Sequence, residues 1–234
     1  MISSSENSKY KLLSKLNIGK HRKKEGKFIV EGSHLVEEAK KAGVLIEAYS
    51  IVEKEGFTLI DESLMRKLCN TDTVVKEIGL CSFIKKEDMT SKILILDGVQ
   101  DPGNMGALMR SACAFGFKTM FIGNGCVDIY NDKVIRSSQG AIFKLNFIFG
   151  NCVDFIDKIK EEYMVLGTNV ERGVSLSNVN KVDKMAIILG NEGNGVSQEV
   201  NDLMLNNIYI PMDDTESLNV AIAGSIIMYE LREI

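Results

Sequence analysis

The sequence predicts an α/β protein built around a mostly parallel β-sheet. Short apolar runs of strand length recur along the chain, as in ILILD (93–97), KTMFIG (118–123) and MAIILG (185–190). Stretches with helical periodicity separate these runs, and a loop rich in Gly, Pro and Asn follows the first of them. Strands that alternate with helices form parallel sheets whose two faces are both covered by helices.

Length and composition are those of a globular protein. The chain has 234 residues, of which 45% are hydrophobic, enough to bury one large core or two modest ones. No apolar run approaches the ~20 residues that cross a bilayer, and the N-terminus lacks a secretory pattern. We therefore expect a cytoplasmic protein with no membrane partner.

Cysteine and histidine usage excludes several classes of site. The five cysteines are far apart and form no C-x-x-C pair, so we expect reduced residues, no disulfide framework and no metal. The only histidines, His21 and His34, lie near the N-terminus. This position excludes a Ser-His-Asp hydrolase in the C-terminal half.

Charge is distributed unevenly along the chain. Residues 1 to 27 contain eight basic and two acidic residues, a net charge of +6, so the remainder carries −10 to give the total of −4. A basic segment of this kind is either a solvated terminus or a surface that contacts phosphates, and charge alone does not decide between them.

The N-terminal part predicts a small α/β domain. A strand over 27–32 precedes a helix that Ser33 caps and that closes at Gly43, and a second strand follows over 44–52. Short helical and extended stretches continue over 61–80. The polar segment 85–92 marks a boundary, giving domains 1–88 and 89–234.

The C-terminal part continues the alternation of strands and helices. Further strands are predicted over 143–149, 163–167 and 207–211, and helices over 131–139, 153–162, 196–205 and 216–233. Three unusual segments, 97–110, 189–197 and 210–225, each follow the end of a predicted strand. Because ligands of such sheets bind beyond the carboxyl ends of the strands, these segments predict one composite site.

The first segment predicts a helix after the Pro102–Gly103 turn, with Asn104 as a possible cap. One apolar stripe at helical spacing contains Met105, Leu108, Met109 and Ala112. Arg110 lies off this stripe. It is either an exposed surface charge or, with Asn104, a residue that reaches a pocket near the helix start.

The second segment, LGNEGNGVS, has glycines at 190, 193 and 195, so its backbone can approach a ligand closely. The spacing is not G-x-G-x-x-G, and no G-K-[ST] phosphate loop exists in the chain, which argues against NAD and ATP sites and against a Rossmann-type enzyme. Glu192 is either a solvated carboxylate or an anchor for Arg110.

The third segment leads from a strand into a helix whose first turn we expect to hold Ser217, Leu218 and Asn219. Small residues follow at Ala221, Ala223, Gly224 and Ser225. Ser217 as an N-cap and the small residues as a packing face explain this segment without a function. Because this segment follows the other two in a fixed order along the chain, the three segments together suggest a site.

The three segments together resemble the SpoU (TrmH-like) family of RNA ribose methyltransferases within the SPOUT class. The motifs are N-x-x-x-x-x-R at Asn104 to Arg110, residues 189–197, and I-P-M at 210–212 with S-L-N-V at 217–220. RSSQGA at 136–141 is similar to the family's R-x-S-x-G-A signature. The resemblance covers 93–234, and the N-terminal part is similar to RNA-binding domains of L30e/L7Ae type.

This resemblance implies a C-terminal domain with a deep trefoil knot, a homodimer, and S-adenosylmethionine as cofactor. Backbone groups of Gly190, Ile210 and Leu218 would hold the cofactor, with Thr168 a weaker candidate. The neighbouring motif residues Leu189, Asn191, Gly195 and Met212 are further cofactor candidates. The implied catalytic residues are Arg110, Asn104, Glu192, Ser217 and Asn219.

The reaction implied is 2′-O-methylation of ribose in structured RNA, with 23S-type ribosomal RNA favoured because of the appended N-terminal domain. A transfer RNA methyltransferase and a non-catalytic RNA-binding or ribosome-assembly protein are the alternatives. The family assigns the hydroxyl proton to Arg110, yet a guanidinium holds its proton near neutral pH, so a second hypothesis is that Arg110 grips a phosphate. The expected RNA contacts are Arg136, Lys20, Arg22, Lys23 and Lys24.

Overall fold

The computed structural model describes residues 1–70, 74–85, 87–169, 172–204 and 206–232. By their contacts the residues form two compact units. Unit 1 is Met1–Ile84 with Asp128–Phe143, and unit 2 is Lys85–Val127 with Lys144–Ile234. The boundary expected after residue 88 stays a prediction, but segment 128–143 makes its contacts within the N-terminal unit.

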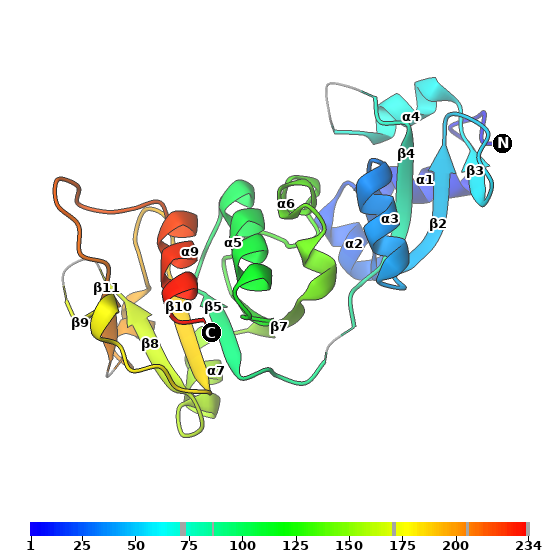
Figure 1. Ribbon diagram of the computed structural model, residues 1–234. Helices are drawn as coiled ribbons and strands as arrows, with labels where there is room; N and C mark the ends of the chain where they lie inside the picture. Colours follow the sequence, from blue (N-terminus) through cyan, green and yellow to red (C-terminus); the bar gives the residue numbers. More distant parts are fainter. Residues whose placement is uncertain (71–73, 86, 170–171, 205, 233–234) are drawn as a thin grey trace. The chain divides into compact units, whose positions relative to one another are not determined.

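Unit 1 contains a small mixed β-sheet. Its strands are β1 (Lys27–Glu31), β2 (Leu45–Ser50), β3 (Phe57–Leu59) and β4 (Glu77–Ser82). Among the described residues four strands lie in the order β1-β4-β2-β3, with β4 antiparallel to both of its neighbours and β2 parallel to β3 (Figure 1). The predicted strands at 27–32 and 44–52 are β1 and β2.

Helices cover this sheet on both sides. They are α1 (Ser8–Lys15), α2 (Gly19–Glu25), α3 (Ser33–Lys41) and α4 (Glu62–Leu68). Leu13 of α1 and Met65 of α4 are fully buried in one core with Ile78 of β4. One prediction about α3 is wrong: Gly32, not Ser33, is the N-cap, because Ser33 already has helical geometry. Gly43 follows the helix with a φ of 71°, as its predicted role requires.

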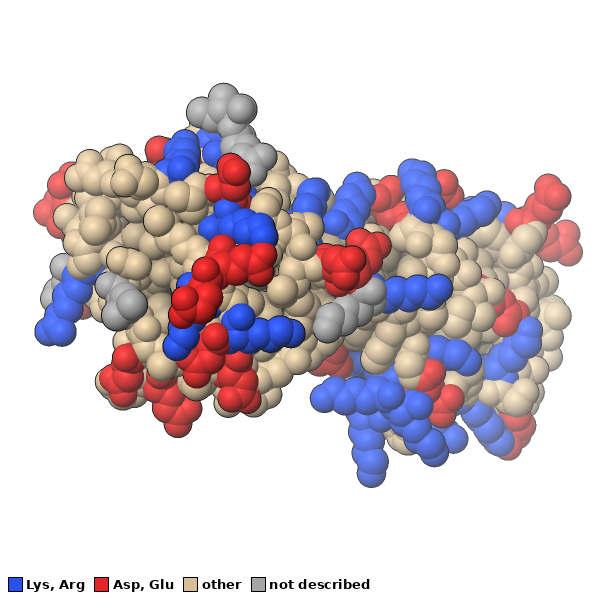
Figure 2. Space-filling model, turned by 90° about the horizontal axis from the view of Figure 1, so that it is seen from below, with Lys and Arg blue, Asp and Glu red and all other residues tan. Residues whose placement is uncertain are grey.

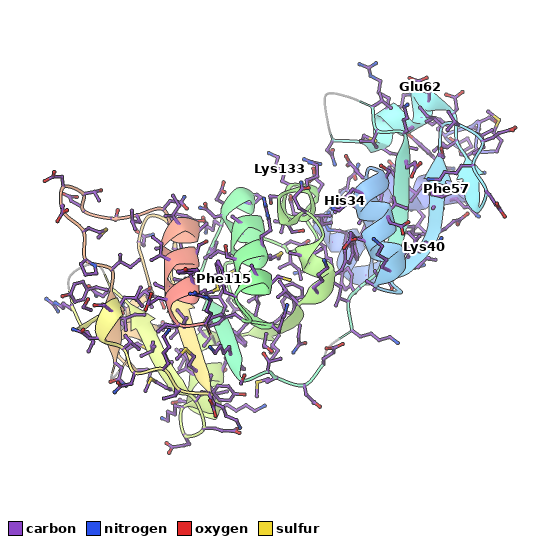
Figure 3. All side chains as sticks on the ribbon, in the orientation of Figure 1. His34, Lys40, Phe57, Glu62, Phe115 and Lys133 are labelled. Carbon is purple, nitrogen blue, oxygen red and sulfur yellow. The ribbon has the colours of Figure 1, made fainter. Side chains whose placement is uncertain are left out.

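Segment 128–143, which includes α6 (Asp132–Ser138), packs onto the rest of unit 1. The ring of Tyr130 lies 4.1 Å from that of Phe83 and 4.6 Å from that of Phe28, measured between centroids. His34 on α3 lies on the side of α6, with Nε2 3.4 Å from the carbonyl oxygen of Gln139 (Figure 3). A segment from the middle of the chain therefore completes the N-terminal unit.

Unit 2 contains the parallel sheet that the sequence predicts. Its strands are β5 (Lys92–Leu96), β6 (Thr119–Gly123), β7 (Asn146–Gly150), β8 (Met164–Thr168), β9 (Val174–Ser175), β10 (Met185–Leu189) and β11 (Asn207–Tyr209). In the described residues these seven strands lie in the order β7-β6-β5-β10-β8-β11-β9, and all pairs are parallel. The predicted fold class is confirmed.

Helices cover both faces of this sheet. They are α5 (Pro102–Ala114), α7 (Cys152–Ile159), α8 (Gln198–Asn201) and α9 (Val220–Glu230). Side chains alternate along a strand, so Ile93 and Ile95 of β5 pack with α7 and α8, while Leu189 of β10 faces α5 and α9. Residues 105, 108, 109 and 112 of α5 are all fully buried, as their spacing predicts.

Two predicted helix starts in unit 2 are wrong. Asp101, not Asn104, caps α5, because its carboxylate accepts the backbone N–H of Asn104 at 2.8 Å. The last helix begins at Val220 rather than near 216, and its N-cap is Asn219 rather than Ser217. Both caps form because a side-chain oxygen at that position reaches free N–H groups of the first turn.

None of the helices within the described residues is long and apolar enough to span a membrane. All five cysteines are free thiols, and Cys81 and Cys152 are buried.

Candidate active site

The three motif segments meet at the carboxyl edge of the unit 2 sheet. They follow β5, β10 and β11, and β5 and β10 are direct neighbours, with β8 between β10 and β11. The chain moves outward from β5 to β6 and β7, then returns on the other side of β5. Such a reversal in strand order opens a ligand crevice in parallel sheets.

Glu192 joins the second segment to the first. Its carboxylate accepts hydrogen bonds from the backbone N–H groups of Gln100 at 3.1 Å and Asp101 at 2.9 Å, and from Asn104 Nδ2 at 3.1 Å. Burial alone would raise the pKa of Glu192, but these donors lower it below the usual range for glutamate. Glu192 is therefore an ionised anchor of the loop that precedes α5.

Asn104 joins the first segment to the third. Its Oδ1 accepts a hydrogen bond from Asn219 Nδ2 at 2.9 Å, while its Nδ2 is held by Glu192. The Oδ1 of Asn219 accepts the backbone N–H groups of Ala221 at 2.9 Å and Ile222 at 3.3 Å. One polar chain, Glu192–Asn104–Asn219, thus links all three motifs.

The loop after β10 is folded tightly on itself. Asn191 and Gly195 exchange two backbone hydrogen bonds, and Asn191 Oδ1 accepts the N–H groups of Gly193 and Asn194. A Cβ at Gly190 would lie 2.0 Å from the carbonyl carbon of Gly195, so only glycine fits there. The glycines predicted to bring backbone close to a ligand therefore also close this loop.

Arg110 and Ser217 differ from the other three expected catalytic residues. Both are exposed, and among the described residues neither side chain has a hydrogen-bond or ion-pair partner. Glu192 therefore anchors Asn104 and the preceding backbone, and the reading of Glu192 as an anchor for Arg110 is corrected. A charged guanidinium and a hydroxyl are left open to substrate.

The chain after β11 lines a cavity of about 550 Å³, formed by Tyr209, Ile210, Pro211, Met212, Asp213, Asp214, Thr215 and Glu216. This volume is in the range of small-molecule and cofactor sites. The expected cofactor residues Ile210 and Met212 line it, and Leu218 follows two residues after Glu216. Within the described residues, no group of three His, Cys, Asp or Glu side chains could hold a metal ion.

Two other expected cofactor residues have structural contacts. Thr168, at the end of β8, donates its hydroxyl to the carbonyl oxygen of Ile188 at 2.8 Å and so ties β8 to β10. Leu189 is 2% exposed and packs toward Gly224 of α9. The side chains of Thr168 and Leu189 are occupied by these contacts, so only their backbone groups could contact a ligand.

The expected RNA-contact residues lie in unit 1 and separate into two groups. Arg22 is 6% exposed, pairs with Asp128 at 2.7 Å and donates to two backbone carbonyls, so its guanidinium is not open to phosphate, contrary to expectation. Arg136 pairs with Asp132 at 2.9 Å and lies 3.6 Å from Glu31. Lys20, Lys23 and Lys24 are exposed.

Two residues with contacts at this edge were not among the sequence candidates. Asp97 accepts the backbone N–H of Ser197 at 2.8 Å, and Asp101 caps α5. The sequence contained a signal for Asp97, since it is a carboxylate immediately after a buried strand. The signal for Asp101 was its position immediately before a proline that begins a helix.

Comparison with known proteins shows that family models match both parts of the chain. The model described as the SpoU rRNA Methylase family matches residues 91–229, more than half of the chain. The model described as the MRM3-like substrate binding domain matches residues 7–78. The N-terminal match thus has the substrate-binding character that the sequence suggested.

Relatives and solved structures match over nearly the whole chain. A Bacillus subtilis protein named 23S rRNA (guanosine(2553)-2'-O)-methyltransferase RlmP is 32% identical over 99% of this chain and 98% of its own. A putative RNA methyltransferase of the TrmH family from Porphyromonas gingivalis is 28% identical, with a TM-score of 0.86, covering 97% of this chain and 98% of its own. An AdoMet-bound rRNA methyltransferase from Sinorhizobium meliloti, 24% identical over 98% of this chain and 96% of its own, shares the fold with a TM-score of 0.86.

Proposed function

We propose, because this chain belongs to the SpoU rRNA methylase family, that it methylates the 2′-hydroxyl of a ribose in ribosomal RNA. The cofactor of the family is S-adenosylmethionine, which supplies an electrophilic methyl group on a sulfonium. Ile210 and Met212, which the family resemblance assigns to the cofactor, line the cavity of about 550 Å³, a volume in the range of cofactor sites.

The observation that carries the proposal is the polar chain Glu192–Asn104–Asn219. Each of these side chains comes from a different motif segment, and each is held by hydrogen bonds of 2.9–3.1 Å to the next. A chain of this kind fixes three loops in one arrangement before any ligand binds. Preorganised positioning is a large part of the catalytic effect when a nucleophile must be held in line.

Arg110 and Ser217 are the residues that address the RNA. The exposed guanidinium of Arg110 stays charged and grips a phosphate next to the target ribose. The hydroxyl of Ser217 donates a hydrogen bond to one lone pair of the 2′-oxygen, which leaves the other lone pair for the methyl group and the hydroxyl proton for a water. S-Adenosylmethionine, when bound, would supply the methyl group to the 2′-oxygen, and the hydroxyl proton would pass to that water.

A direct test uses the purified protein, S-adenosylmethionine labelled in its methyl group, and total RNA from cells that lack the gene. The expected result is label in ribosomal RNA, at a nucleotide that resists alkaline cleavage on its 3′ side. RNA without label would contradict the proposal and favour a binding protein that keeps the fold. Label confined to transfer RNA would retain the reaction but reject the substrate.

We propose that ribosomal rather than transfer RNA is the substrate. The relative named for 23S rRNA matches both the catalytic and the N-terminal part of this chain, so the two proteins share the module that binds substrate. The RNA partner is then bound by unit 1 and methylated by unit 2.

The lysines of α2 are proposed to contact phosphates. Basic side chains crowd one part of the surface of unit 1 (Figure 2). Lys20, Lys23 and Lys24 are exposed and have no ion pair among the described residues, whereas some other lysines of unit 1 pair with carboxylates. The paired lysines are Lys9, Lys11, Lys41 and Lys54, of which Lys9, Lys41 and Lys54 match the three of α2 in number.

This difference supplies a matched control. Replacement of Lys20, Lys23 and Lys24 by Ala should weaken RNA binding and lower the slope of log affinity against log salt by roughly 1 per lost contact. Replacement of Lys9, Lys41 and Lys54 removes the same charge and should leave the slope near that of the natural protein. Equal slopes for the two triple variants would reject a specific role for α2.

A homodimer is proposed to form through α9. Ile222, Ile226 and Tyr229 recur at helical spacing and are 54%, 39% and 51% exposed, so α9 presents an apolar stripe to solvent. Figure 3 shows Phe115 between α5 and α9, and its ring contacts that of Tyr229 edge-on. A second copy of this chain would cover the stripe.

Sedimentation of the natural chain should give the mass of a dimer, and Ile226→Asp should give a monomer. Val182→Asp, at a residue that is 36% exposed outside α9, is the control and should remain a dimer. A monomeric natural chain would reject the proposal. The trefoil knot remains a prediction from the family resemblance, and a cytoplasmic location, where ribosomal RNA is accessible, remains a prediction from the lack of a secretory pattern.

A further inference from the structure

Asp97 lies at a junction of the two loops that follow β5 and β10. Its backbone N–H donates to the carbonyl oxygen of Leu189 at 2.9 Å, which extends the pairing of β5 with β10 by one residue. Its side-chain Oδ2 accepts the backbone N–H of Ser197 at 2.8 Å. Asp97 is half-buried and connects residues that are 100 positions apart in the sequence.

The loop from Gly190 to Ser197 is internally closed, so its position depends on what holds its two ends. The entry end is held by Asn191, whose Nδ2 donates to the carbonyl oxygen of Gly98 at 2.8 Å, and by Glu192. At the exit end, Val196 is buried beside α7 and α8. Among the described residues, Asp97 is the side chain from outside the loop and α8 that bonds the exit end.

The thiols near the Asp97 carboxylate are uncharged. Burial, followed by the negative charge of Asp97, raises the pKa of the Cys152 thiol to about 12. Burial likewise raises the pKa of the Cys126 thiol. Both thiols are protonated at neutral pH, and each lies within hydrogen-bond range of the carbonyl oxygen of Leu96.

We propose that Asp97 is a positioning residue for the cofactor loop: its hydrogen bond to Ser197 holds loop 190–197 in the conformation that receives S-adenosylmethionine. This inference rests on the proposed function. Gly190, Asn191 and Gly195, which the family resemblance makes cofactor candidates, all lie within loop 190–197. Loss of the exit bond would let the loop sample other conformations and lower the fraction that binds cofactor.

Two single variants remove the same bond from opposite sides. Asp97→Ala removes the acceptor, and Ser197→Pro removes the donor, because proline has no N–H and the φ of Ser197, −60°, suits a proline ring. Asp97→Asn keeps an oxygen that can accept the bond. Asp202→Ala is the matched control, since Asp202 accepts a hydrogen bond from Gln198 within α8 and touches neither loop.

The first measurement is the apparent KM for S-adenosylmethionine with total ribosomal RNA as methyl acceptor. We expect Asp97→Ala and Ser197→Pro to raise this KM about tenfold, equivalent to ~1.4 kcal/mol, with kcat and the KM for RNA near the natural values. Asp97→Asn and Asp202→Ala should behave as the natural protein. An unchanged KM in Asp97→Ala, or an Asp97→Asn variant as poor as Asp97→Ala, would overturn the proposal.

The second measurement needs neither cofactor nor activity. Amide hydrogen exchange across 190–197 in the cofactor-free protein should accelerate in Asp97→Ala and Ser197→Pro, while exchange in the strands of unit 2 stays unchanged. Natural exchange rates in both variants would overturn the inference. A natural protein that binds no S-adenosylmethionine, yet shows this exchange pattern, would reject the proposed function and leave the fastening of the loop intact.

Discussion

The five residues expected to be catalytic serve two physical roles. Glu192, Asn104 and Asn219 are bonded to one another, and their polar atoms are occupied by loops and helix ends. Arg110 and Ser217 are exposed and have no side-chain partner among the described residues. The first three therefore fix the geometry of the site, and the other two are available to an incoming RNA.

Arg110→Ala should lower the rate of methyl transfer by about a hundredfold or more, because the RNA loses a charged contact beside the reacting ribose. Binding of S-adenosylmethionine, followed by calorimetry, should be largely kept. Lys158→Ala, which removes an exposed cation from α7, is the control and should leave the rate unchanged. Transfer at the natural rate in Arg110→Ala would contradict the assignment.

Arg22 shows that neighbouring basic residues of one helix can have opposite roles. Arg22→Ala should lower the free energy of unfolding by on the order of 3 kcal/mol, because it leaves Asp128 and two carbonyl oxygens without their donor. Lys23→Ala should change stability by less than about 0.5 kcal/mol. Urea denaturation measures both, and equal values would contradict the buried role of Arg22.

Among the elements, α9 packs closely against its neighbours at Gly224. Gly224 faces β10 and α5, and a Cβ there would lie 2.5 Å from Leu189 Cδ1 and 2.6 Å from Leu108 Cδ2. The small residues that suggested close packing in the sequence thus have that role at this position. The same helix begins at the Asn219 cap, so its packing sets where the third motif lies.

Gly224→Ala should destabilise the protein by about 1–3 kcal/mol, because the added methyl group forces α9 away from the sheet. The intrinsic helix preference of alanine over glycine, about 1 kcal/mol, acts in the opposite direction and reduces the net effect. Thermal unfolding tests the balance. A variant more stable than the natural protein would mean that α9 can move without cost.

At the scale of the whole molecule, the chain passes between the two compact units three times. This happens because segment 128–143 lies between strands of unit 2 in the sequence yet belongs to unit 1. Tyr130 is the centre of this arrangement. It is 6% exposed, its ring stacks on Phe83, and its hydroxyl accepts the backbone N–H of Ile84 at 3.0 Å. Unit 1 is therefore not built from the N-terminal part alone.

Tyr130→Ala should destabilise unit 1 by about 3–5 kcal/mol, as expected for loss of a large buried aromatic side chain. Limited proteolysis should then cut first within 1–84, while unit 2 resists. Phe149→Ala, at a residue that is 58% exposed on β7, is the control and should not change the pattern. Cleavage that begins in unit 2 would contradict the division of the chain.

The sequence by itself determined the α/β class, the parallel strands of unit 2, the buried stripe of α5 and the order of the motifs, because these depend on local periodicity and on residue types at fixed spacing. Only the tertiary structure decided that Glu192 holds Asn104, that Arg22 is buried, that Asp97 bonds Ser197, and that segment 128–143 belongs to unit 1. Each of these depends on which distant segments come together, and a single sequence contains no direct record of such contacts. The N-cap positions also differ from those predicted, because several polar residues near each helix start could serve as the N-cap and the packed structure selects one of them.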